Sequence, residues 1–514
     1  MINNYARALK NRVERIFEQY DRVALYGTGK KLIEVMQYVP DSSKVCAIID
    51  RDDSDKIGSY INDIPVMKLK EIEENVDVIL ISNSKYQTEI YDRIQGAISK
   101  ENKLDVLKLY DFGDEPIYSN SVEEQKNYLE YIEKMLLRKQ DGFIDISSEK
   151  YELDSKDVRV LAWYLPQYYE IPSNNEIYGR GFTEWSNTSR TIPVYVGHNQ
   201  PRIPYDVGYY CLNSPEVMQR QVELAKMYGI YGFCFHYYWF SGERTMEKPL
   251  FLFRQNENID FHYCINWATE DWTASWNGGD KRVIYKQKIE PGDDVRFWND
   301  IKPFFEDRRY IRVDNKPLLI IYSVRFERES AINSFLSSLQ KLAQKDGFEG
   351  LYILITNRYG EPEQVEYYGA DGVVVYGADD QFFANCPTKD VDGYINPYFS
   401  GNVYDYKEYV EKKMYQRTFN NTNVFYGALT GFDNSARYSE KASIYDGSTP
   451  DLYKKWLKYA IEKNSECHKP EDNYVFVGSW NEWAEASYLE PDYRFGYGYL
   501  QKTKEAIRES RIDD

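Results

Sequence analysis

Two glutamates and two tryptophans alternate in the segment "VFVGSWNEWAEASYLEPD", residues 475–492. Glu482 and Glu485 directly follow an apolar run, and Trp480 and Trp483 flank them. If residues 481–486 form a helical turn, positions three apart lie on one face with Cβ atoms about 5 to 6 Å apart. Retaining enzymes that act on glycosidic bonds place two carboxyl groups about 5 to 5.5 Å apart. The segment therefore predicts a catalytic carboxylate pair for glycosidic chemistry.

Other interpretations of the polar residues stay open. Glu485 also fits a residue that caps or solvates a helix start, and Glu490 is expected to lie in a loop or at a helix terminus. His236 fits either a buried core histidine or a donor to a sugar hydroxyl. The four histidines include no H-x-x-x-H pair and no thiolate partner at ligand spacing, so no metal site is expected. The sequence has no G-x-S-x-G motif for serine chemistry.

The back two thirds of the chain contain eight continuous apolar runs separated by helical patterns. The runs span residues 158–165, 229–239, 260–268, 316–323, 351–357, 371–377, 423–430 and 474–480. Continuous hydrophobicity is typical of parallel strands that are covered on both faces. Eight such strands with helical connections predict an α/β fold in which residues 158–514 form a (β/α)8 TIM barrel.

In such barrels the active site is built at the carboxyl ends of the strands. The residues expected to bind substrate at this rim are Tyr164, Gln167, Glu184, Trp185, His236, Tyr237, Tyr238, Trp239, Asn266, Trp267, Glu270, Trp272, Trp480, Asn481 and Trp483. Aromatic rings with a polar tip, amides and carboxylates suit sugar rings. No lysine or arginine cluster is expected at this rim, so it does not look like a phosphate site.

The front third reads as a small Rossmann-like α/β domain over residues 1–115. Apolar runs at 22–26, 44–50 and 76–82 read as strands, and Gly27 and Gly29 form a turn before a helical pattern. With Asp50 about 20 residues on, these glycines predict a nucleotide or nucleotide-sugar site, although Leu32 stands where a third glycine belongs. The alternatives are a turn without ligand, or a metal-binding D-x-D motif at Asp50 and Asp52. Residues 116–157, which include the charged helical pattern at 121–139, are the expected connector.

Bulk composition excludes several classes of partner. With 64 Lys and Arg against 82 Asp and Glu, the net charge of −18 repels nucleic acid and anionic lipid. The six cysteines include no C-x-x-C pair and are expected to be reduced core residues. No apolar stretch is long enough to span a bilayer, and the first 22 residues lack the apolar region of a secretory signal. The expectation is a cytoplasmic protein without a transmembrane segment.

Five motifs together resemble the WbsX group of polysaccharide-biosynthesis proteins, whose domain is similar to glycoside hydrolase family 99. They lie at residues 163–188, 197–210, 228–242, 265–276 and 479–492, within a similarity that covers about residues 158–505. The resemblance implies a barrel that retains anomeric configuration without a covalent glycosyl-enzyme and needs no cofactor. It implies that Glu482 is the base that deprotonates the substrate 2-hydroxyl, which attacks the anomeric carbon to give a 1,2-anhydro sugar. Glu485 is then the acid and afterwards the base.

The chain departs from the family pattern at two positions. Thr269 stands where the pattern W-A-N-E-x-W has an amide that could bind a sugar hydroxyl, and Ala486 stands where glycine is usual after the second glutamate. Both changes bear on substrate identity, and Ala486 is expected to crowd the loop that carries Glu485.

Three hypotheses follow from the sequence. The first is a retaining hydrolase or transglycosylase that acts on a cell-surface polysaccharide of the O-antigen or capsule type, or on its lipid-linked precursor. The second is a glycosyltransferase that draws on a nucleotide sugar held by the N-terminal domain. The third is a non-catalytic glycan-binding scaffold. The partner in each case is an oligosaccharide or polysaccharide.

Overall fold

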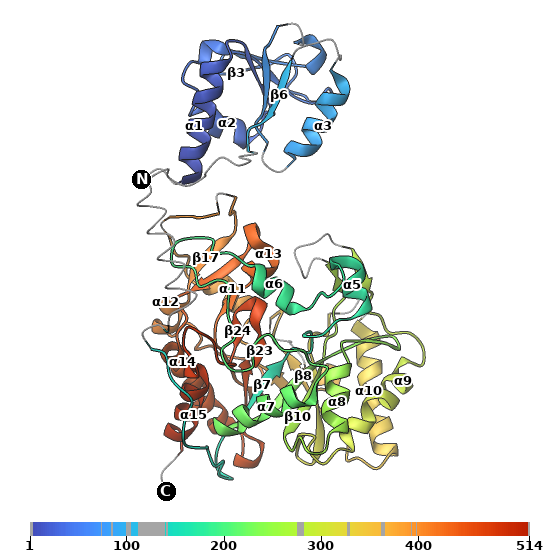
Figure 1. Ribbon diagram of the computed structural model, residues 1–514. Coiled ribbons are helices and arrows are strands. Elements are labelled where there is room, and N and C mark those ends of the chain that lie inside the picture. The colour runs from blue at the N-terminus through green and yellow to red at the C-terminus, as the bar shows by residue number, and fades with distance from the viewer. Residues whose placement is uncertain are drawn as a thin grey trace. The chain divides into compact units, whose positions relative to one another are not determined.

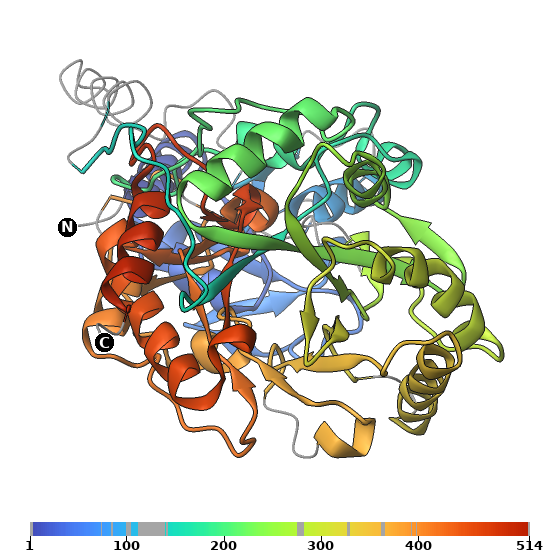
Figure 2. The same cartoon turned by 90° about the horizontal axis from the view of Figure 1, so that it is seen from below.

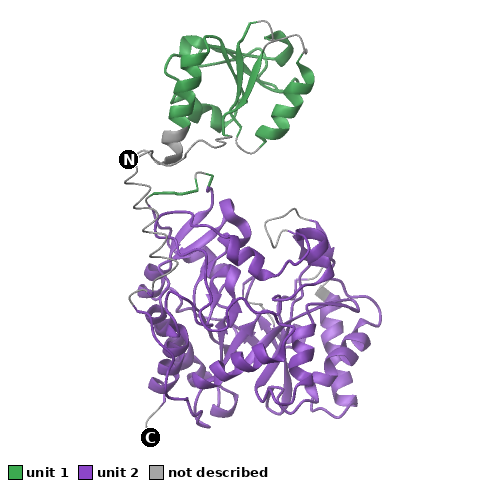
Figure 3. Cartoon of the chain, in the orientation of Figure 1, with its two compact units in different colours: residues 1–130, 392–398 green, residues 131–391, 399–514 purple. Residues whose placement is uncertain are grey.

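The chain divides into two compact units. The computed structural model describes residues 4–72, 75–83, 86–98, 104–110, 139, 142–274, 282–325, 329–360, 365–391, 393–396 and 398–511. One unit comprises Met1–Glu130 with Asp392–Tyr398, and the other comprises Tyr131–Val391 with Phe399–Asp514 (Figure 3). The division falls inside the expected connector, whose helical pattern at 121–139 lies outside the described residues except for Lys139. No pattern in the sequence predicts that residues 392–398 belong to the first unit.

The N-terminal unit is an α/β unit built on a six-stranded sheet (Figure 1). The strands are β1 (Val23–Tyr26), β2 (Val45–Ile49), β3 (Tyr60–Ile61), β4 (Ile64–Met67), β5 (Val78–Ile81) and β6 (Asp105–Lys108), in the order β3-β4-β2-β1-β5-β6. All neighbours pair in parallel except β3 and β4. The three strands expected from the apolar runs are confirmed as β1, β2 and β5.

Helices cover both faces of this sheet, which explains why its strands are continuously apolar. Residues of α1 (Asn4–Gln19) and α2 (Lys30–Met36) pack on one face against Leu25 and Leu80. Residues of α3 (Gln87–Ala97) pack on the other face against Ile49 and Ile79. Successive strand residues point to opposite faces, so a strand covered on both sides needs an apolar side chain at every position.

The second unit is built around a nearly closed parallel barrel. Its strand order is β18-β16-β15-β14-β10-β8-β7-β22-β19, with β9 and β13 attached at the side. The bounds are β7 (Arg159–Tyr164), β8 (Ile230–Phe240), β10 (His262–Trp267), β14 (Lys316–Ile321), β15 (Tyr352–Thr356), β16 (Gly372–Val374), β18 (Val424–Phe425), β19 (Gly427–Leu429) and β22 (Tyr474–Gly478). Each of the eight predicted runs contains a strand. The two end strands of this order, β18 and β19, are separated in the chain by Tyr426 alone, so the sheet almost returns onto itself.

Helices surround the barrel strands (Figure 2). Those between barrel strands are α5 (Pro172–Tyr178), α6 (Glu184–Arg190), α7 (Pro215–Met227), α8 (Lys248–Gln255), α9 (Asp293–Phe305), α10 (Glu329–Lys345), α11 (Asp380–Asn385), α12 (Tyr406–Glu411), α13 (Ser435–Tyr438) and α14 (Pro450–Cys467), and α15 (Gly498–Glu509) follows the last strand. Between β15 and β16 the described residues form only a 3₁₀ turn, Val365–Tyr368. Of the short strands, β9 (Glu243–Thr245) pairs with β8 and β13 (Arg312–Val313) with β14. Small separate sheets are formed by β11 (Trp272–Thr273) with β12 (Val283–Tyr285), by β17 (Asn402–Asp405) with β21 (Ser443–Asp446) and β20 (Phe432–Asp433), and by β23 (Asn481–Glu482) with β24 (Ser487–Tyr488).

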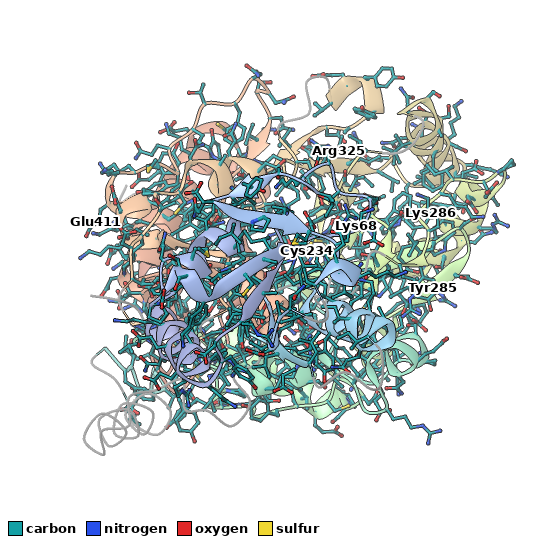
Figure 4. The ribbon with its side chains drawn as sticks, turned by 90° about the horizontal axis from the view of Figure 1, so that it is seen from above. Lys68, Cys234, Tyr285, Lys286, Arg325 and Glu411 are labelled. Atoms are coloured by element: carbon teal, nitrogen blue, oxygen red, sulfur yellow. The ribbon has the colours of Figure 1, made fainter. Side chains whose placement is uncertain are left out.

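The six cysteines are all free thiols. Cys234 of β8, labelled in Figure 4, is the register neighbour of Cys264 on β10, and both are buried in the barrel core. Cys211 and Cys467 are exposed, so the expectation that the cysteines lie in the core is wrong for these two. Within the described part of the chain, no helix is both long and apolar enough to cross a membrane.

Candidate active site

The carboxylate pair lies on a tight turn after the last barrel strand. Beyond β22, strand β23 (Asn481–Glu482) pairs antiparallel with β24 (Ser487–Tyr488), and a 3₁₀ turn, Trp483–Glu485, joins them. A short helical turn keeps side chains three apart on the same side. Glu482 and Glu485 accordingly line the same cavity.

This cavity, of about 110 Å³, is formed by residues that follow the carboxyl ends of the barrel strands. Its charged lining residues are Glu184, Glu270, Asp271, Glu482, Glu485, Arg358 and Arg437. Aromatic side chains form much of the remaining wall, among them Tyr238, Trp272, Tyr322 and Tyr376. The wall therefore offers acids, hydroxyls and ring faces, and it also contains two arginines that the sequence analysis did not expect at this rim.

Six of the residues expected to bind substrate line the cavity: Gln167, Glu184, His236, Tyr238, Glu270 and Trp272. The other nine do not line it and are buried in the surrounding structure: Tyr164, Trp185, Tyr237, Trp239, Asn266, Trp267, Trp480, Asn481 and Trp483. Strand β8 shows the physical reason, because its side chains alternate in direction. His236 and Tyr238 face the cavity, whereas Tyr237 donates a hydrogen bond to Asp300 on the outer helix α9.

Several of the nine buried residues support the site from behind. Asn266 Nδ2 lies 3.0 Å from His236 Nδ1. The amide of Asn481 bridges both backbone groups of Leu165, at 2.8 and 3.0 Å, and so ties the turn to the end of β7. Tyr168 donates a hydrogen bond to the carbonyl of Asn481. The contacts of Asn481 and Tyr168 hold the turn that carries Glu482 and Glu485, and the contact of Asn266 holds the His236 ring in the cavity wall.

Glu490 holds the two tryptophans of the motif. Its Oε1 accepts hydrogen bonds from Trp480 Nε1 at 3.1 Å and Gln221 Nε2 at 2.7 Å. Its Oε2 accepts from Trp483 Nε1 at 2.7 Å and the Tyr210 hydroxyl at 3.0 Å. Burial raises the pKa of Glu490 to about 7, against these four hydrogen bonds, which lower it. Glu490 lies in a bend after β24, as expected of a loop residue, but its carboxylate is buried among these four donors.

The two carboxyl groups of the pair differ in their surroundings. Burial raises the pKa of Glu482 well above its ordinary value, the neighbouring Glu485 raises it further, and the Arg437 guanidinium opposes both effects without offsetting them. Nε2 of His236 lies 3.6 Å from Glu482 Oε1, and burial lowers the pKa of His236 to about 4. Histidine is therefore neutral beside Glu482 at neutral pH, while Glu485 contacts Arg437 Nη1 at 2.5 Å. The pair favours a proton on Glu482, and Glu485 is the member that forms the ion pair with Arg437.

The opposite wall contains Glu270 and Arg358. Glu270 accepts a hydrogen bond from the Tyr359 hydroxyl, and burial raises its pKa. Arg358 contacts Asp380 at 3.1 Å and packs over the rings of Tyr359 and Phe383. Thr269 stands where the family pattern has an amide that could bind a sugar hydroxyl. Its own hydroxyl donates to the Ser323 carbonyl and accepts from the Ser323 N–H, so it is bonded within the protein.

Residues 160–503 match the family model described as glycosyltransferase WbsX. The chain belongs to the WbsX glycosyltransferase family. This confirms the resemblance drawn from the five motifs. Residues 19–104 match a second model, described as C2185-like, N-terminal.

Curated relatives and solved structures are similar to parts of the chain. The uncharacterized protein WxcX of Xanthomonas campestris pv. campestris is 33% identical over 348 residues, which are 68% of this chain and 49% of the relative. The chain thus spans about half the length of the curated relatives it matches. The GH99 endo-alpha-mannosidase from Bacteroides thetaiotaomicron superposes with a TM-score of 0.43 and 14% identity, over 70% of this chain and 98% of that one. A glycoside hydrolase-like protein gives a TM-score of 0.44 and 13% identity, over 71% and 98%.

The WbsX-family position where glycine is usual has a special backbone conformation in this chain. Ala486 adopts φ +51° and ψ +27°, the left-handed region, directly after the turn that carries Glu485. Glycine takes this conformation without the strain that a Cβ atom causes. The strain lies in the backbone of this residue.

Replacing Ala486 with glycine should therefore raise the free energy of unfolding, by about 1 kcal/mol. Urea denaturation followed by tryptophan fluorescence measures the change. Ala484 is a matched control, because it is also buried but does not have a positive φ. Ala484→Gly should lower the stability, and equal losses in both variants would contradict the interpretation.

In the N-terminal unit, residues at the predicted nucleotide site hydrogen-bond one another. Gly27 has φ +113° and lies between β1 and α2, and Gly29 precedes α2 directly. Asp50 accepts hydrogen bonds from the hydroxyls of Thr28 at 2.6 Å and Ser54 at 2.9 Å. Burial raises the pKa of Asp50, but these bonds outweigh it and the pKa is lowered. Among the described residues no group of three or more potential metal ligands occurs, at the D-x-D position or elsewhere.

Among the residues of the cavity wall that the sequence analysis missed are Arg437, Arg358, Tyr322 and Tyr376. The last three follow the ends of β14, β15 and β16 within four residues, so the strand-end rule could have found them. Arg437 lies on α13, eight residues beyond the end of β19, and is brought in by the small sheet of β17, β21 and β20. No local pattern marks that position.

Proposed function

We propose that this chain is a carbohydrate-active enzyme that breaks or forms glycosidic bonds with retention of anomeric configuration. Its process is the biosynthesis or processing of a cell-surface polysaccharide of the O-antigen or capsule type. The observation that carries the proposal is that Glu482 and Glu485 face one cavity from a single turn. Membership of the WbsX glycosyltransferase family supports it. The proposed substrate is an oligosaccharide or polysaccharide, free or lipid-linked.

The proposed chemistry uses one proton on two carboxyl groups. Glu482 takes the proton of the substrate 2-hydroxyl as this oxygen attacks the anomeric carbon, and Glu485 gives a proton to the leaving oxygen. The 1,2-anhydro sugar is then opened at the anomeric carbon by water or an acceptor hydroxyl, whose proton returns to Glu485, while Glu482 gives its proton back to the 2-oxygen that is released. Two inversions at the anomeric carbon give net retention.

The electrostatics support a pair that carries a single proton in the neutral range. Two close carboxyl groups cannot both ionise readily, and the pair titrates in two separate steps. In the free protein Glu482 is the favoured proton carrier, because burial and the neighbouring Glu485 both raise its pKa. The proton can therefore pass to Glu485 inside the cavity when the substrate 2-hydroxyl takes its place beside Glu482.

The test is a panel of aryl glycosides and nucleotide sugars, incubated with the full chain and followed by proton NMR of the anomeric products. Release or transfer of a sugar with the starting anomeric configuration is the expected result. Products of inverted configuration would overturn the retaining mechanism. Glycan binding without turnover of any donor would favour the scaffold hypothesis instead.

A nucleotide-dependent reaction is the second candidate function. The observation that favours it is a parallel sheet with β1 at its centre, followed by the Gly27 turn and by Asp50 at the end of β2. This arrangement supports a Rossmann-like domain with a nucleotide or nucleotide sugar at the carboxyl edge of the sheet. Calorimetric titration of the full chain with nucleotide sugars, compared with Gly27→Val, tests the site. Equal heats for both proteins would contradict it.

A further inference from the structure

Arg437 is a buried cation that joins a catalytic carboxylate to a third acid. Its Nη1 contacts Glu485 Oε1 at 2.5 Å, and its Nε and Nη2 contact Glu184 Oε1 at 2.8 and 2.7 Å. The exposed fraction of its side chain is 9%, and that of Glu184 is 1%. The guanidinium thus uses three of its five N–H groups on two carboxylates.

Glu184 fixes the direction of this guanidinium. It begins helix α6, whose start is closed by a reciprocal capping box between Thr183 and Ser186. Two contacts from a planar guanidinium to one carboxylate leave little freedom of rotation. Because Nε and Nη2 are held by Glu184, the third N–H group is aimed at Glu485.

The histidine and the tyrosines around the pair are neutral at neutral pH, and Asp271 of the cavity wall forms an ion pair with Lys286 at 3.0 Å. Burial lowers the pKa of His236 to about 4, so its ring carries no charge there. The tyrosines near the pair and the guanidinium are Tyr168, Tyr178, Tyr238, Tyr322, Tyr376 and Tyr438, and burial raises the pKa of each above its ordinary value. Two charged groups of the opposite wall, Glu270 and Arg358, contact other partners. Among the described residues, the cation in contact with the pair is Arg437.

This contact is asymmetric. Arg437 forms an ion pair with Glu485, whereas Glu482 has the uncharged His236 as its near neighbour, at 3.6 Å. Without this contact, two carboxyl groups three residues apart on one turn would bind a shared proton with more similar affinities. The position of one guanidinium, set by Glu184, distinguishes them.

We propose that Arg437 is a positioning residue that holds Glu485 in an ion pair, leaves Glu482 as the proton carrier of the free protein, and so sets the pH range in which the pair holds one proton. The inference rests on the proposed function for its catalytic meaning. Glu184 acts through Arg437, which changes the sequence-based expectation that Glu184 binds substrate directly.

The test compares Arg437→Met with Arg437→Lys. Removing a cation from beside a carboxylate pair raises both titration steps, by about one to three pH units for a charge at this distance. Both limbs of the pH profile of turnover should therefore move to higher pH in Arg437→Met, by at least about one unit. Arg437→Lys retains the charge and should keep the limbs within about half a unit of the wild type. A lower rate with unmoved limbs in Arg437→Met would overturn the proposal.

The matched control is Arg417→Met. Arg417 forms an equally buried ion pair with Asp379, at 2.6 Å, and does not line the cavity. Arg417→Met should lower the free energy of unfolding and leave both limbs of the pH profile of turnover unmoved. Arg437→Met leaves Glu184 buried without its cation, which can prevent folding. In that case the double variant Glu184→Gln with Arg437→Met, which removes both charges, is measured in place of the single variant.

A second measurement separates this inference from the proposed function. Infrared difference spectra of the full chain follow the carboxylic acid band as a function of pH, and Glu482→Gln identifies the part that belongs to the pair. That part should persist to higher pH in Arg437→Met than in the wild type, even if no substrate is turned over. An unchanged infrared titration would overturn the role of Arg437 while leaving the enzymatic function to the substrate panel.

Discussion

Replacing either Glu482 or Glu485 with glutamine should reduce kcat/KM by at least about 10³-fold, because a positioned acid or base contributes about 10² to 10⁴ in rate. Glutamine preserves the size of the side chain but can neither accept nor give the proton. The measurement is turnover of the best substrate of the panel by the wild type and both variants. The control is Glu170→Gln, since Glu170 is exposed and lies outside the cavity wall.

The two variants should respond differently to the leaving group. A good leaving group needs little help from an acid, so Glu485→Gln should recover much of its rate with a dinitrophenyl glycoside. Glu482→Gln should stay slow with the same substrate, because the attack of the 2-hydroxyl still lacks its base. Recovery in Glu482→Gln alone would reverse the two assignments. Activity within tenfold of the wild type in both variants would contradict the carboxylate pair altogether.

The strands were predictable because burial on both faces forces an apolar residue at every position. The run at 474–480 and the acids that follow it place Glu482 and Glu485 at a strand end, which is where parallel barrels hold their sites. Local sequence was sufficient for that inference. The turn itself was a condition of the prediction, and the structure supplies it as the 3₁₀ turn Trp483–Glu485, which lets residues three apart face one cavity.

The direction of the aromatic side chains was not predictable in the same way. All residues from His236 to Phe240 are aromatic, so the run gives no sign of which alternate set faces inward. The structure sets the phase, and Tyr237 is consequently directed at a helix. The roles of Arg437 and Glu490 were missed for a different reason: Arg437 pairs with Glu184, and Glu490 binds Gln221 and Tyr210 as well as the nearby tryptophans, and no spacing rule connects these distant partners.

Glu490→Gln should lower the free energy of unfolding of the barrel by about 2 to 4 kcal/mol, because four hydrogen-bond donors converge on this carboxylate. Glutamine has one acceptor oxygen, and its NH₂ group would face a donor that cannot accept. Each buried donor left without a partner costs about 1 to 3 kcal/mol. Guanidinium denaturation followed by tryptophan fluorescence is the measurement, and it reports on the barrel because all ten tryptophans lie between residues 163 and 483.

The same variant should change the pH dependence of stability. The folded-state pKa of Glu490 is about 7, above its ordinary value of 4.5, so the folded chain binds this proton more tightly than the unfolded chain. The resulting stabilisation is fully present below pH 4.5 and is lost as the pH rises through 7. The difference between the two pKa values corresponds to about 3 kcal/mol. The stability gap between wild type and Glu490→Gln should therefore be larger at pH 5 than at pH 8, whereas a constant gap would place the proton elsewhere in the core.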